Sequence, residues 1–137
     1  MKRRNFAIVT LVLTLLLSMT MFFGCGKKTK VTVNGDNVSF VAETVEGTPT
    51  MVEFMQQLQE EGSLTVRVEN GSIVEINGKA NSVESGIWVL YSTCGAPGVN
   101  NNGKSLEVSG NFYYPAENAD TITVNQNQFY IWHYQTA

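Results

Sequence analysis

The chain has 137 residues, of which 12 are acidic and 9 basic, so its formal net charge is −3. This length provides for one domain with a single core and is too short for two. The acidic balance argues against nucleic acid as a partner, because nucleic-acid-binding surfaces are strongly basic.

The N-terminal segment has the pattern of an export signal. Residues 2–4 are basic, and residues 6–23 form an almost unbroken apolar run. A basic head, an apolar run and a small residue at the cut site are the marks of a secretory signal. Here the small residue is Gly24, Cys25 follows it at once, and this pair resembles the lipobox of bacterial lipoproteins. The resemblance implies that residues 1–24 are removed and that Cys25 carries the lipid, including palmitate, that holds the mature protein in the membrane.

A second interpretation of the same segment is an uncleaved membrane anchor. An apolar run of about eighteen residues is just long enough to cross a bilayer. Both interpretations place the rest of the chain on the extracytoplasmic face of the cell membrane, which makes it a cell-surface protein. The two differ in whether residues 1–24 are removed and in whether Cys25 carries a lipid.

Residues 25–30 are the expected tether, and residues 31–137 the domain that follows it. The tether contains Lys27, Lys28 and Lys30, the one basic cluster of the mature chain. Each of these cations would gain roughly 1 kcal/mol beside anionic headgroups. Removal of the three basic residues of the signal leaves six basic residues against 12 acidic ones, so the mature chain has a net charge of about −6.

The domain begins with a predicted hairpin and one helix. Residues 31–33 and 38–45 alternate apolar and polar side chains around the turn sequence 34–37, as hairpin strands do. Thr50 and Glu53 then have the spacing of a capping box, which predicts a helix start, with Thr48 as a competing cap. Apolar side chains recur at helical spacing until Gly62 ends the segment, and we expect them to pack against a sheet. These side chains are Met51, Phe54, Met55 and Leu58.

Beyond the helix the sequence alternates strands and turns. Asn70-Gly71 and Asn77-Gly78 predict tight turns, because both residue types tolerate positive φ. Residues 86–91 are the most hydrophobic stretch of the mature chain, so we expect the central strand there. The predicted strands of this half are residues 64–68, 73–76, 86–91, 106–108, 112–114, 121–124 and 129–134. One helix among many short strands indicates an α+β fold, with the helix packed on one face of a mainly antiparallel sheet.

Several landmarks follow the hairpin and helix in a recognisable order. They are Ile76-Asn77-Gly78, Gly86-Ile87-Trp88 and a closing strand with Tyr130, Trp132 and Tyr134. Together they resemble the transcobalamin C-terminal-like domain, a bacterial family of otherwise unknown function. The resemblance implies a ubiquitin-like β-grasp core and cobalamin, or a related corrinoid, as ligand. The chain departs from the family's pattern at residues 92–95 and in its longer segment 103–119, which we expect to form an extra β insertion.

The side chains needed for catalysis are sparse. His133 is the only histidine, which excludes a metal site built on several imidazoles. Cys94 has no basic neighbour in sequence that would activate its thiol. We expect Cys94 to be a small buried residue, with an intermolecular disulfide as the alternative. We therefore expect no enzyme, no catalytic residue, no metal and no resident cofactor.

The remaining candidates for binding are aromatic and amide side chains. Aromatic residues with polar tips suit ligand or partner surfaces, although we expect Trp88 and Trp132 to lie in the core. The loop of residues 92–104 is rich in Gly and Asn, and loops held by a rigid scaffold concentrate binding residues. The predicted ligand-binding residues are Tyr91, Asn100, Asn101, Asn102, Tyr113 and Tyr114.

These features leave three functional hypotheses. The first is a cell-surface lipoprotein whose small extracytoplasmic domain binds a small molecule, with a corrinoid as the ligand that the resemblance implies. The second is a protein-interaction or adhesion module of the cell envelope, which uses a free sheet edge or an aromatic surface. The third is an envelope structural protein without a ligand. A concave apolar surface would favour the first hypothesis, and a flat aromatic patch or a free edge the second.

Overall fold

The computed structural model describes residues 29–137. Cys25, the signal segment and most of the tether lie outside these residues. Within them the chain forms a mostly β protein with one short helix. Its elements are β1 (Val31–Asn34), β2 (Asn37–Val41), α2 (Met51–Glu60), β3 (Val66–Glu69), β4 (Ser72–Ile76), β5 (Lys79–Ala80), β6 (Gly86–Ser92), β7 (Leu106–Val108), β8 (Asn111–Pro115) and β9 (Phe129–Thr136).

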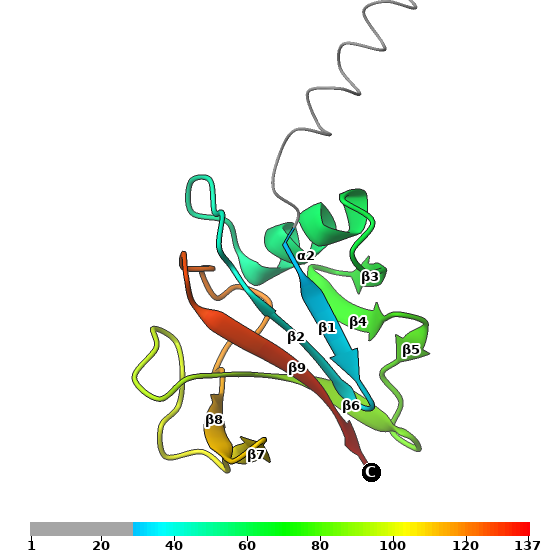
Figure 1. The fold of residues 1–137 in the computed structure, drawn as a ribbon. Coiled ribbons are helices and arrows are strands. Elements are labelled where there is room, and N and C mark those ends of the chain that lie inside the picture. Colours follow the sequence, from blue (N-terminus) through cyan, green and yellow to red (C-terminus); the bar gives the residue numbers. More distant parts are fainter. Residues whose placement is uncertain (1–28) are drawn as a thin grey trace, which may run out of the picture.

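Six strands form one curved antiparallel sheet, a half-barrel, in the order β1-β2-β9-β6-β8-β7. The strands β3, β4 and β5 form a second, small sheet. Figure 1 shows α2 and the small sheet on one side of the β2-β9-β6 strands, and the hairpin of β7 and β8 on the other. The expected antiparallel sheet with a helix on one face is confirmed, and so is the position of β6 inside the sheet.

The helix begins and ends where the sequence predicts. The Thr50 side chain accepts a hydrogen bond from the Glu53 backbone N–H at 3.3 Å, which satisfies one free amide of the first turn. At the other end Gly62 has φ of 79°, and the Ser63 backbone N–H donates to the Leu58 carbonyl at 2.9 Å. This arrangement closes the last turn with a residue in the left-handed conformation, which glycine adopts without steric cost.

The core lies between α2 and the large sheet. Phe54 of the helix stacks on Phe40 of β2 with ring centroids 5.5 Å apart. Trp88 and Trp132 are buried on the same side of the sheet, as predicted. The apolar helix stripe, Met51, Phe54, Met55 and Leu58, is fully buried. The helix therefore packs on one face of the sheet and leaves the other face free of helical cover.

Two expectations for local structure are wrong in detail, and one short strand was not predicted. Residues 121–124 form no strand but a single bridge from Thr123 to Thr50, because their backbone groups bond to the start of the helix instead of a sheet. The second hairpin strand stops at Val41 rather than near residue 45, because the chain there turns toward the helix and the Ala42 N–H bonds to Gln128. The short strand β5 follows the Asn77-Gly78 turn and was not predicted, since two residues carry no periodicity.

Candidate functional site

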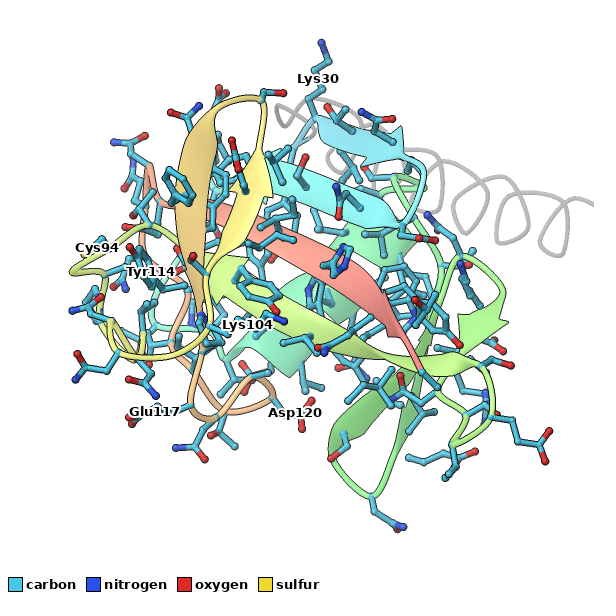
Figure 2. The ribbon with its side chains drawn as sticks, turned by 90° about the horizontal axis from the view of Figure 1, so that it is seen from below. Lys30, Cys94, Lys104, Tyr114, Glu117 and Asp120 are labelled. Atoms are coloured by element: carbon cyan, nitrogen blue, oxygen red, sulfur yellow. The ribbon has the colours of Figure 1, made fainter. Side chains whose placement is uncertain are left out.

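The face of the large sheet turned away from α2 is the candidate site, and we call it the open face. Side chains alternate between the two faces along every strand, so the register fixes which residues belong to it. Its residues are Thr32, Asn34, Asn37, Ser39, Val41, Ile87, Val89, Tyr91, Leu106, Val108, Asn111, Tyr113, Pro115, Phe129, Ile131, His133 and Gln135. Figure 2 looks toward this face, with α2 behind the sheet.

No Asp, Glu, Lys or Arg stands at any open-face position. This is notable because all 12 acidic residues of the chain belong to the described domain. The solvated face of an antiparallel sheet is ordinarily polar, and charged side chains are the residue types least often buried. The composition of the open face therefore differs from that of an ordinary solvent-exposed sheet face.

One end of the open face is covered by the hairpin of β7 and β8. Tyr113 of this hairpin lies against Phe129 of β9, with ring centroids 5.0 Å apart. Beneath this cover Tyr91 is only 7% exposed and Ile131 only 1%, although no helix lies on this side. Figures 1 and 2 both place the hairpin on the side of the sheet opposite to α2. The hairpin thus forms a wall at one end of a sheet surface that is otherwise open.

The uncovered part combines apolar side chains with one polar pair. Ile87 is 50% exposed and Val41 38%. Between their strands the His133 Nδ1 atom lies 2.6 Å from Asn37 Oδ1, a hydrogen bond that joins β9 to β2. Burial lowers the pKa of His133 below its ordinary value of 6.5, and the nearby Asp36 carboxylate opposes this shift. At neutral pH the imidazole is therefore uncharged, and the open face stays neutral.

Tyr91 is an aromatic neighbour of His133. The two rings meet edge to face, with centroids 6.3 Å apart. Burial raises the pKa of the Tyr91 phenol above its ordinary value of 10.0. The phenol therefore also stays neutral, so neither His133 nor Tyr91 carries charge near pH 7.

The six predicted ligand-binding residues lie in three places, which are the open face, the opposite side of β8 and the loop that contains residues 100–102. Tyr91 and Tyr113 belong to the open face, whereas Tyr114 pairs with Ser92 and therefore turns to the opposite side of the strand. Tyr113 and Tyr114 are both half-buried, and their neighbour Phe112 is the exposed ring of this strand. The register thus shows that the two adjacent tyrosines point to opposite faces.

In the loop of residues 92–104, asparagine side chains accept hydrogen bonds from the loop's own backbone. Asn101 Oδ1 accepts a hydrogen bond from the Gly95 N–H at 2.9 Å, and Asn100 Oδ1 accepts one from the Asn102 N–H at 3.1 Å. Cys94 in the same loop is exposed, so the expected burial is wrong. The physical reason is the turn itself, which leaves β6 after Ser92 and carries the thiol away from the core.

A cavity of about 290 Å³ lies beside this loop, but none of the six predicted residues lines it. Gly98 makes the close approach there, because a Cβ at this position would lie 2.7 Å from the Ile122 Cδ1 atom. The lining residues are Pro97, Gly98, Glu117, Asn118, Thr121, Ile122, Thr123 and Asn125. The cavity is at the lower limit of ligand pockets and carries no aromatic wall.

Sequence reasoning missed the His133–Asn37 pair and the exposed Ile87. These residues can be identified from the alternation of side chains along each strand together with the absence of charged residues on one face. The residues that share a face are known only once the strand register is known. In residues 29–137 no group of three or more His, Cys, Asp or Glu side chains is placed to hold a metal ion. The same residues contain no helix long and apolar enough to cross a membrane.

Comparison with protein families, with curated proteins and with solved structures finds no match to this chain. The sheet geometry and the chemistry of the open face therefore carry the functional argument.

Proposed function

We propose that this protein is a membrane-anchored extracytoplasmic interaction module that docks a protein partner of the cell envelope through its open face. The anchor is the lipid on Cys25, and the mature protein starts at that residue. The single observation that carries the proposal is the absence of Asp, Glu, Lys and Arg from the strand positions of the open face in an acidic domain.

The composition of the open face supports a protein partner. The centres of protein interfaces are depleted of charged residues and enriched in aromatic ones. The aromatic wall of Tyr113 and Phe129 stands at one end of the face, and Ile87 and Val41 offer exposed apolar area along it. Asn, Ser and Thr side chains between them provide hydrogen-bonding groups whose desolvation costs far less than that of a charge.

Site-specific photo-crosslinking tests this proposal. A photoreactive amino acid at Ile87 is placed in the full-length lipoprotein in its native cells, and crosslinked proteins are identified by mass spectrometry. Val83 is the matched control, because it is 96% exposed but lies outside the open face. We expect a defined crosslinked partner from Ile87 and none from Val83. The same products from both positions, or no product from Ile87, would contradict the proposal.

A corrinoid ligand is the second candidate, and the ring pair of Tyr113 and Phe129 is the observation that favours it. A flat macrocycle gains stacking area on such rings, and the pair adjoins the loop of residues 92–104. Titration of the purified domain with cobalamin, followed by fluorescence and calorimetry, tests this candidate. We expect Tyr113→Ala to weaken binding, and also Asn101→Ala. No heat and no quenching at millimolar cobalamin would contradict it.

We also propose that the domain is related to the β-grasp fold. It is supported by the order of a hairpin, one helix and a closing strand, with the helix on one sheet face. The pairing of β9 differs from that of a ubiquitin-like core. Here β9 runs antiparallel to β2, the second strand of the hairpin. In a ubiquitin-like core the closing strand pairs in parallel with the first strand of the hairpin.

A further inference from the structure

The chain enters the domain at a fixed point. Thr29 is only 8% exposed, and its carbonyl oxygen accepts a hydrogen bond from Ser63 Oγ at 3.3 Å. Ser63 is itself bonded through its backbone N–H to Leu58 in the last turn of α2. The entry point is therefore built into the C-terminal end of the helix.

The membrane attachment lies a short distance before this point. Cys25 precedes Thr29 by four residues, and four fully extended residues span at most about 14 Å. An uncleaved apolar segment would end at residue 23, six residues before Thr29, so for that kind of anchor the bound is about 22 Å. With the lipid on Cys25, Thr29 must accordingly stay within about 14 Å of the lipid surface, and the C-terminal end of α2 lies beside Thr29.

The open face lies on the other side of the molecule. Figure 1 shows the chain entering beside α2 and the start of β1, with the β7–β8 hairpin at the far side of the sheet. The view from below in Figure 2 looks toward the open face. We propose that Thr29, Ser63 and the last turn of α2 form the surface that faces the membrane, and that the open face is thereby presented away from it. This inference rests on the membrane attachment in the proposed function.

The chemistry of the membrane-facing surface indicates contact without insertion. Met51, Phe54, Met55 and Leu58 of α2 are buried in the core, so the helix has no apolar stripe left for lipid. Glu60 and Glu61 at its end repel anionic headgroups, whereas the lysines of residues 27–30 are attracted to them. The short basic tether thus holds the domain at the headgroup level with the helix end toward the lipid.

Depth-dependent fluorescence quenching tests this orientation. The full-length lipoprotein, carrying Cys94→Ser to remove the exposed thiol, is reconstituted into vesicles of phosphatidylethanolamine and phosphatidylglycerol with nitroxide-labelled headgroups. A fluorophore is attached at Glu60→Cys or at Glu107→Cys. Both positions are exposed glutamates, the first in the last turn of α2 and the second in β7. Intact mass confirms the lipid on Cys25 in every sample.

We expect the label at residue 60 to be quenched several-fold more than the label at residue 107. Equal quenching, or stronger quenching at residue 107, would overturn the inference. A flexible Gly/Ser linker of about 20 residues inserted between Lys28 and Thr29 should abolish the difference, because it extends the reach of the tether well beyond the domain. A difference that survives the linker would also overturn the inference. An unlipidated Cys25 in the intact mass would instead refute the anchor in the proposed function, so the two failures are distinguishable.

Discussion

Phe54 joins the only helix of the described chain to the sheet. Its ring is 1% exposed and stacks on Phe40. Because Phe54→Ala leaves a cavity between helix and sheet, we expect a loss of about 3–5 kcal/mol in the free energy of unfolding, measured by urea denaturation. Gln56→Ala, on the exposed side of the same helix, is the control and should change stability by less than about 0.5 kcal/mol. A loss below about 1 kcal/mol for Phe54→Ala would contradict the packing described.

Gly86 is the one strand residue whose conformation and surroundings both require glycine. It has φ of 148°, and a Cβ there would clash with the Gln135 carbonyl and lie 2.9 Å from the Tyr134 ring. Gly110 also has positive φ but has open space around it. We expect Gly86→Ala to lower the melting temperature clearly more than Gly110→Ala, for which the left-handed backbone alone costs about 1–2 kcal/mol. Equal losses would show that the close approach of β6 to β9 at Gly86 is absent.

His133 makes the stability of the domain depend on pH. Its pKa in the folded state is lowered by burial, so in acid the unfolded chain binds the proton more readily than the folded one. Stability should therefore fall as pH drops from about 6.5 toward the lowered pKa of the folded state. We expect the free energy of unfolding to decrease more between pH 7.5 and 5.5 in the native chain than in His133→Gln. The same decrease in both proteins would contradict the assigned burial.

At the scale of elements, the segments with strong local signals could be predicted from the sequence. The capping pair Thr50 and Glu53 and the terminating Gly62 locate α2, because helix ends depend on side chains close in sequence. Asn77-Gly78 likewise locates a turn through its positive φ angles. The prediction of a strand at residues 121–124 is wrong. The side chains there alternate as in a strand, but the backbone groups form hydrogen bonds with the start of the helix.

The candidate site could be predicted only in part, for a reason that lies in the pairing of distant strands. Tyr91 and Tyr113 were selected for their chemistry, and both belong to the open face. Asn37 and His133 are 96 positions apart in sequence, and their hydrogen bond exists only because β2 pairs with β9. No local pattern encodes that pairing. The charge-free face therefore emerges only from the assembled sheet.

At the scale of the whole molecule, the proposed lipidation of Cys25 would determine where the domain is located. The Gly24-Cys25 pair at the end of the apolar run predicts processing and acylation at Cys25. We expect Cys25→Ser to abolish incorporation of labelled fatty acid and to leave the signal attached, as measured by intact mass. An intact signal segment in the native protein would contradict the lipoprotein interpretation and favour the uncleaved anchor.

The central claim is that the open face is the docking surface, and the affinity of the crosslinked partner for matched variants tests it most directly. Ile87→Asp places a charge on that face, whereas Val83→Asp places the same charge at an exposed position outside it. Because a carboxylate in an interface must be desolvated without a counter-charge, we predict at least tenfold weaker binding for Ile87→Asp, about 1.4 kcal/mol. Val83→Asp should bind like the native protein, and both variants should keep its melting temperature. Equal affinities of the native protein and both variants would contradict the account.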